Sequence, residues 1–184
     1  MRTLKVVSIP CMLLLLSGCA AVISVHPLAG PDDKDAVFDP ALVGTWEDVD
    51  TPGNGAGTRF NVTGHDSAYS VTVDGDGTTY TMRLLKVGGR YLLDVDCPSD
   101  GPSPPVHMFL KLRRQNDTAW VASMDSQWLM EQIKTRGQPR HETLEEDSHR
   151  ILLTASPTEL REFLLPYAGD DRAFSDEGQL RRVK

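Results

Sequence analysis

Residues 68–95, AYSVTVDGDGTTYTMRLLKVGGRYLLDV, alternate apolar and polar side chains around two tight-turn sequences. In the first run, Tyr69, Val71 and Val73 fall on one face of an extended chain. The turns are Asp74-Gly75-Asp76-Gly77 and Gly88-Gly89, and these residue types tolerate the positive φ of tight hairpins. Because a period of two indicates half-buried strands, this stretch predicts three consecutive antiparallel strands in a meander.

The same pattern extends in both directions along the chain. It predicts earlier strands at 43–49 and 58–62 and later ones at 106–113 and 118–124. Prolines between residues 98 and 105 indicate a loop, and Asn116-Asp117 indicates a turn. The meander is therefore expected to contain about seven strands.

The period changes after residue 124. Asp125 is a good cap for a helix over 126–136, and Gly137 is placed to end it. Ser156 and Glu159 form a capping-box pattern with Pro157 at the first helical position, which predicts a second helix. We expect a loop or frayed helix over the acidic stretch 141–150 and a short strand over 151–154. The fold class is thus α+β, mainly antiparallel β: a meander sheet or a barrel of about seven to eight strands, with two helices near the C-terminus.

Gly44-Thr45-Trp46, at the start of the first predicted strand, resembles the opening motif of the lipocalin superfamily. The sequences at 38–43 and 91–94 are also similar to those of uncharacterised bacterial lipocalin-like lipoproteins. The resemblance covers residues 38–125 and implies a barrel closed at one end by Trp46, with a ligand cavity inside. The predicted helix after the seventh strand departs from that family, so an open, helix-plugged sheet stays an alternative. From its chemistry alone, Trp46 is a core ring whose N–H needs an acceptor.

The N-terminal segment has the pattern of a secretion signal. Arg2 and Lys5 precede the apolar run 6–16. The following Leu16-Ser17-Gly18-Cys19 resembles the lipobox of bacterial lipoproteins. That resemblance implies cleavage before Cys19 and a diacylglycerol thioether on its sulfur, and it admits a further acyl chain such as palmitate on the new amino group. Ala20 favours the outer membrane over the inner membrane in the enterobacterial sorting pattern.

Two alternatives to lipidation stay open at this stage. The uncharged run 6–25 is long enough to span a bilayer as an uncleaved helix, although Pro10 weakens it. A plain secretory signal is the other alternative. On the lipoprotein interpretation, residues 1–18 are the signal peptide, 19–37 a lipidated flexible tether, 38–178 one β-rich domain and 179–184 a frayed tail.

Composition restricts the possible partners. The net charge is −7, and it becomes −9 once Arg2 and Lys5 leave with the signal. An acidic surface argues against nucleic acid and against electrostatic docking on anionic lipid. The anchor on Cys19 would be the membrane contact. Cys97 would then be the only free thiol, so no internal disulfide can form.

The sequence offers no convincing catalytic or metal-binding pattern. The five histidines, His26, His65, His107, His141 and His149, lack the short spacing of zinc motifs. Asp74-Gly75-Asp76-Gly77 lacks the later ligands of a calcium loop, so a hairpin turn is favoured. Asp94 and Asp96 share one strand face, as a pair suited to acid–base chemistry would. We expect no enzyme and no cofactor.

Three functions follow from these features. The first is a membrane-anchored envelope lipoprotein whose lipocalin-like barrel binds a small apolar ligand. The second is a periplasmic interaction or inhibitor module with no pocket, for which the anchor raises local concentration. The third is an enzyme acting on envelope components, built around His107 and neighbouring carboxylates.

Overall fold

The computed structural model describes residues 22–30, 33–49, 57–98, 105–145 and 150–183. The predicted meander is present, and each strand pairs with the next in antiparallel register. Its strands are β4 (Arg59–His65), β5 (Ala68–Val73), β6 (Thr79–Val87), β7 (Arg90–Cys97), β8 (Val106–Gln115) and β9 (Thr118–Met124). Alternation of burial along β5 and β6 confirms the period of two on which the prediction depended.

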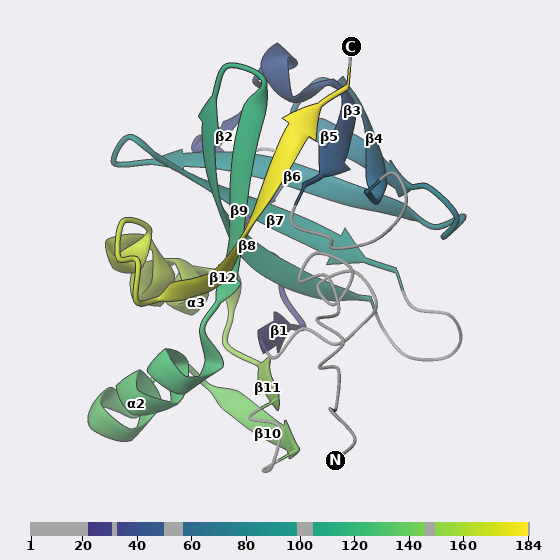
Figure 1. Ribbon diagram of the computed structural model, residues 1–184. Coiled ribbons are helices and arrows are strands. Elements are labelled where there is room, and N and C mark those ends of the chain that lie inside the picture. Colours follow the sequence, from purple (N-terminus) through teal and green to yellow (C-terminus); the bar gives the residue numbers. More distant parts are fainter. Residues whose placement is uncertain (1–21, 31–32, 50–56, 99–104, 146–149, 184) are drawn as a thin grey trace, which may run out of the picture.

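Two further strands close this meander into a barrel. β3 (Gly44–Asp48) pairs with β4, and β12 (Phe174–Arg182) lies between β3 and β9. Within the described residues, eight strands therefore form a closed ring, β3 to β9 followed by β12 (Figure 1). The structure is a lipocalin-like barrel, and the alternative of an open sheet is wrong.

The prediction of a frayed tail at 179–184 is wrong for residues 179–182, because they belong to β12. Leu180 is buried and lies between Asp48 of β3 and Ala119 of β9. A register irregularity between Ser175 and Gly178 leaves the intervening charged residues exposed. Because these charged residues interrupt the alternation of apolar and polar side chains, the sequence did not indicate a strand here.

A small side sheet continues from the first half of β8. β1 (Val22–Ser24) pairs in parallel with β11 (Arg150–Leu153), which pairs with β10 (His141–Glu145). On its other edge, β1 meets β8 where Ser24 faces His107. The short β2 (Ala36–Val37) pairs with β6. The described part of 19–37 is therefore folded, so the predicted flexible tether and the domain boundary at residue 38 are wrong. The loop or frayed helix predicted over 141–150 is also wrong where the structure describes it, because residues 141–145 form β10 and Arg150 begins β11.

Both predicted helices are present in the described part of the chain. α2 (Ser126–Arg136) begins at its cap Asp125 and ends at Gly137, which has a left-handed φ of 68°. α3 (Pro157–Leu164) has the complete Ser156–Glu159 capping box and runs into the 3-10 helix η2 (Leu165–Tyr167). Among the residues the structure describes, no helix has the length and apolar character needed to cross a membrane.

The barrel wall separates two hydrophobic cores. Inward side chains such as Leu84, Leu93 and Leu110 fill the barrel. Outward side chains such as Leu85 and Phe109 pack instead with the helices and the side sheet. Strands β6, β7 and β8 are thus buried on both faces, so the helices and the N-terminal segment are part of one folded body.

Deletion of residues 178–184 tests the role of β12. We expect the truncated chain to lose its cooperative thermal transition, because both neighbours of the removed strand would expose unpaired edges. Circular dichroism during heating measures this. The exposed Arg181→Ala variant is the control, with an expected change within about 0.5 kcal/mol. A truncated chain that melts like the full chain would contradict closure by β12.

Candidate functional site

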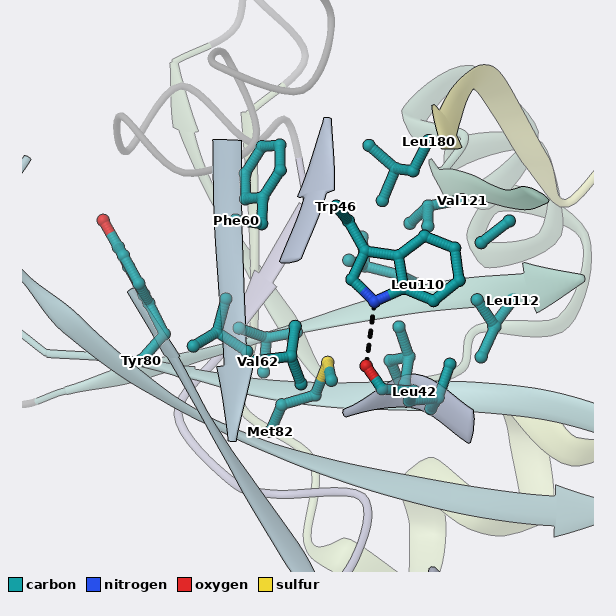
Figure 2. Close-up of a pocket in the computed structure, with 14 residues that line it drawn as sticks. Leu42, Trp46, Phe60, Val62, Tyr80, Met82, Leu110, Leu112, Val121 and Leu180 are labelled. Carbon is teal, nitrogen blue, oxygen red and sulfur yellow. Dashed lines mark hydrogen bonds between the residues drawn. The ribbon is translucent and has the colours of Figure 1, made fainter. Parts of the chain in front are cut away.

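Trp46, on β3, is buried in the barrel core beside the 3-10 helix η1 (Pro40–Leu42). The side chain of Asp39 caps η1 by accepting a hydrogen bond from the amide of Ala41 at 2.9 Å. η1 in turn places the carbonyl of Leu42 2.8 Å from the indole nitrogen of Trp46, which donates to it (Figure 2). The ring is 2 % exposed and its single polar group is satisfied.

Arg182, at the end of β12, covers the outer side of Trp46. Its guanidinium carbon lies 4.5 Å from the centre of the indole ring. The same group donates to the carbonyl of Val43 at 2.7 Å and to that of Ala41. Its Nε also lies 3.6 Å from Asp117, in the β8–β9 turn. Arg182 therefore joins its own strand β12 to Trp46 of β3 and to η1. Sequence reasoning missed it because it fell in the predicted frayed tail.

The contact with Arg182 also explains the glycine of the Gly44-Thr45-Trp46 motif. Gly44 has a φ of 137°, a backbone conformation that residues with a side chain rarely adopt. A Cβ placed there would lie 2.3 Å from Nη1 of Arg182. The position must therefore stay without a side chain for the guanidinium to reach the carbonyl groups.

A second set of contacts braces the same region. The hydroxyl oxygen of Tyr69 accepts a hydrogen bond from the amide of Asp39 at 2.6 Å. Phe38 stacks on the Tyr69 ring with centroids 5.0 Å apart. Burial raises the pKa of Tyr69, so this hydroxyl stays neutral at physiological pH. Arg114 of β8 pairs with the free carboxylate oxygen of Asp39 at 3.1 Å.

Beside Trp46 and η1 lies an apolar cavity of about 70 Å³. Side chains from all eight ring strands and η1 line it (Figure 2). They are Leu42, Trp46, Phe60, Val62, Val71, Tyr80, Met82, Leu93, Val95, Leu110, Leu112, Ala119, Val121 and Leu180. The structure thus places Trp46 in the cavity wall.

The polar atoms of this lining are already engaged. The hydroxyl of Tyr80 donates to Asp76, in the β5–β6 turn, at 2.8 Å. Burial, then the hydrogen bond to Asp76, raises the pKa of Tyr80 to about 12, so it carries no charge near neutral pH. The indole N–H is also hydrogen-bonded. The contacts left for a ligand in the cavity are therefore dispersion contacts with carbon and sulfur atoms.

The cavity has an energetic consequence. A void of this size in a packed core costs about 1.7 kcal/mol at roughly 24 cal/mol per Å³, and an apolar void stays dry. An apolar molecule that fills it would recover part of that free energy. Pockets for drug-sized ligands measure roughly 300–1,000 Å³, so a ligand of that size would require the lining side chains to move.

A polar cluster lies on the opposite side of the barrel wall. Asp94 is 3 % exposed and accepts hydrogen bonds from the amides of Leu28 and Ala29, at 2.6 and 3.0 Å. Its other oxygen lies 2.9 Å from Nδ1 of His107. Asp94 therefore fastens the N-terminal segment to β7, a structural role that sequence reasoning missed, because the partner amides lie more than sixty residues away.

Arg161 of α3 fastens the same segment from the other side. Its guanidinium donates to the carbonyl of Leu28 at 3.1 Å and to the carboxylate of Asp33 at 2.6 Å. It also donates to Asp35. The described residues of this segment, 22–30 and 33–37, are thus held by strand pairing, a buried carboxylate and a half-buried arginine.

The remaining predicted site residues have simpler roles. Leu16, Ser17, Gly18 and Cys19 lie outside the described residues. Asp74 accepts from Asn61 and Asp76 from Thr78, both at 2.9 Å, so the two carboxylates stabilise the hairpin. Burial, then the carboxylates of Asp96 and Asp94, raises the pKa of Cys97 to about 12, which keeps this thiol unreactive.

The histidines do not converge on one site in the described part of the chain. His107 pairs with Asp94, and Nδ1 of His141 lies 3.1 Å from the carbonyl of Pro139. No cluster of three or more His, Cys, Asp or Glu side chains within the described ranges could hold a metal ion.

Comparisons of the chain with family models, with curated proteins and with solved structures find no match. The class of this protein, a closed lipocalin-like barrel with two helices between β9 and β12, therefore rests on the strand topology of its described residues.

Three glycine substitutions test the contact between Gly44 and Arg182. Gly44→Ala should lower the free energy of unfolding by about 3 kcal/mol, since it adds both backbone strain and a clash with Arg182. Gly75→Ala adds strain at a φ of 86° but meets no atom within 4 Å, so about 1 kcal/mol is expected. Gly30→Ala, which has neither feature, is the neutral control.

Urea denaturation measures all three variants. Equal stability losses for Gly44→Ala and Gly75→Ala would contradict a stabilising role for the Arg182 guanidinium in the position that it occupies beside Gly44.

Proposed function

We propose that this protein is a lipid-anchored lipoprotein of the bacterial envelope whose barrel takes up a small apolar ligand. The observation that carries the ligand half of the proposal is the apolar cavity behind Trp46. The lipobox-like Leu16-Ser17-Gly18-Cys19 supports the anchor.

The cavity lining selects the chemistry of the ligand. Charged or strongly polar molecules would lose their hydration without gaining hydrogen bonds, at a cost of several kcal/mol. A small hydrocarbon, or the narrow end of an acyl chain, would pay no such cost. Met82 is suited to adjust to such a ligand, because its unbranched side chain has several rotatable bonds.

The anchor supplies the location. Two or three acyl chains on Cys19 would hold the protein firmly, at about 0.8 kcal/mol per buried methylene. Ala20 favours the outer membrane, with the barrel in the periplasm. A barrel that accepts apolar molecules would then work beside the bilayer in which such molecules are concentrated.

The modest cavity volume favours a second candidate, a periplasmic interaction or inhibitor module that uses its surface. On that alternative the void is a packing imperfection, and filling it would change stability alone. The ligand experiment below separates the two candidates.

Expression of the full chain in a bacterium with lipoprotein processing tests the anchor. We expect the intact mass to show loss of residues 1–18 and gain of acyl groups, and the protein to fractionate with membranes. Cys19→Ser should abolish both the acyl mass and the fractionation, while Cys97→Ser should leave them unchanged. An unprocessed chain that begins at Met1 and carries no acyl group would contradict the anchor.

Filling the cavity tests the ligand. Ala119→Leu adds three carbons to the lining, so it should weaken binding of a short alkane or fatty acid by about tenfold or more. Methyl NMR of Met82, Leu110 and Val121 during titration measures this. Ala68→Leu, on the outer face of β5, is the matched control and should bind normally.

Saturable methyl shifts in the unmodified chain and in Ala68→Leu, reduced in Ala119→Leu, are the expected result. The absence of any saturable shift across alkanes and fatty acids of increasing length would contradict ligand uptake and favour the interaction module.

A further inference from the structure

We propose that the side sheet is mounted directly against the bilayer surface, with the β10–β11 edge around Leu144 in contact with lipid headgroups. This inference rests on the proposed anchor at Cys19 and specifies how the folded body is oriented by it.

The first step is the length of the linker. The first described strand, β1, starts at Val22 and lies between β11 and β8, so it is held on both edges. Only Ala20 and Ala21 lie between Cys19 and Val22, so the three Cα–Cα steps that join them span at most about 11 Å. A lipidated Cys19 would therefore keep the start of β1 within that distance of the headgroups.

The second step is that release of β1 and the residues after it from the folded body would cost free energy. Asp94 and Arg161 fasten residues 28–35 just beyond β1. Val22 itself is buried in the outer core, to which Phe109 and Ile151 also belong. Release of the segment to form a longer tether would expose these side chains and leave the Asp94 carboxylate without its amide donors.

The third step identifies the surface beside the anchor. Val22 pairs with Ile151, which pairs with Thr143, so two strand spacings of about 4.8 Å place Thr143 about 10 Å from Val22. The next residue, Leu144, lies at a register irregularity between Thr143 and Glu145. Such bulges redirect a side chain out of the regular pattern. Leu144 is 47 % exposed, the highest value among the large apolar side chains of the described chain.

The fourth step is the direction of the barrel. β8 runs from His107, beside β1, to Gln115, at the turn that Arg182 contacts, a length of about 26 Å. Figure 1 shows the β10–β11 hairpin and the β8–β9 turn at opposite ends of the body. The end of the barrel that carries Arg182 would therefore point away from the bilayer.

Electrostatic attraction does not explain the proposed contact between the β10–β11 edge and the lipid headgroups. The net charge of the chain is acidic, and Glu142 is exposed beside Leu144. The short linker imposes the contact, so the arrangement should not depend on the charge of the lipid.

A distance measurement on the lipidated chain tests the proposal. A fluorescent amino acid is placed at Leu144 or, as the matched control, at the exposed Gln115, and acceptors are placed in the headgroups of phosphatidylethanolamine vesicles. Energy transfer from position 144 should exceed that from position 115 several-fold, with and without added phosphatidylglycerol. Equal transfer from the two positions would overturn the proposal.

A spacer shows whether the linker is the cause. About 12 Gly and Ser residues inserted between Ala21 and Val22 span about 19 Å and should bring the two signals close together. The same spacer inserted between Gly88 and Gly89, far from the anchor in sequence, should preserve the difference. A difference that survives the first insertion would contradict an orientation imposed by the linker.

Intact mass separates this test from that of the anchor. If Cys19 carries no acyl chain, the anchor in the proposed function is wrong, but the proposed orientation has not yet been tested. The orientation is then tested on a chain that begins at Cys19, carries Cys97→Ala and is coupled through its single thiol to a maleimide phospholipid. Unequal transfer there supports the mounting, and equal transfer overturns it.

Discussion

The barrel depends on the contact between Arg182 and Trp46, because it joins the two ends of the ring. β12 pairs with β3 on one edge and with β9 on the other, and Arg182 stands at the end of that strand. Its guanidinium lies over the indole and donates to the carbonyl of Ala41 in η1 and to that of Val43, the residue after η1. A cation over an aromatic ring contributes about 0.5–2 kcal/mol, and buried carbonyls gain donors as well. Gly44 and the cap at Asp39 are consequences of that arrangement, since one makes room for the guanidinium and the other positions η1.

The same barrel wall serves two cores, which links the N-terminal segment to the proposed function. The inner core leaves the apolar cavity, while the outer core receives the helices and the side sheet. Asp94 is the point where the two meet: its strand contributes Leu93 and Val95 to the interior, and its own carboxylate holds residues 28 and 29 outside. If Cys19 is anchored, the fastened N-terminal segment would therefore hold the barrel in a fixed position relative to the anchor.

Sequence reasoning predicted the elements whose signals are local. The period of two gave β5 to β9, and capping residues placed both helices correctly at Asp125 and Ser156. It failed where the structure depends on distant partners. β1 continues an apolar run that resembles a signal sequence, and β12 carries the charged residues Asp176, Glu177 and Arg181, so neither showed alternation. The roles of Arg182 and Asp94 depend on backbone groups 139 and 66 residues away, which no local pattern encodes. Trp46 was singled out because its motif is local, whereas the residue that covers it was not.

Closure of the ring by β12 is the central claim, and nuclear Overhauser contacts from Leu180 test it most directly. The register predicts contacts from the backbone of Leu180 to Asp48 on one side and to Ala119 on the other. Both sets observed in the same folded chain would establish the closed barrel. Contacts to one neighbour alone, or to neither, would show an open sheet and would remove the cavity on which the ligand proposal depends.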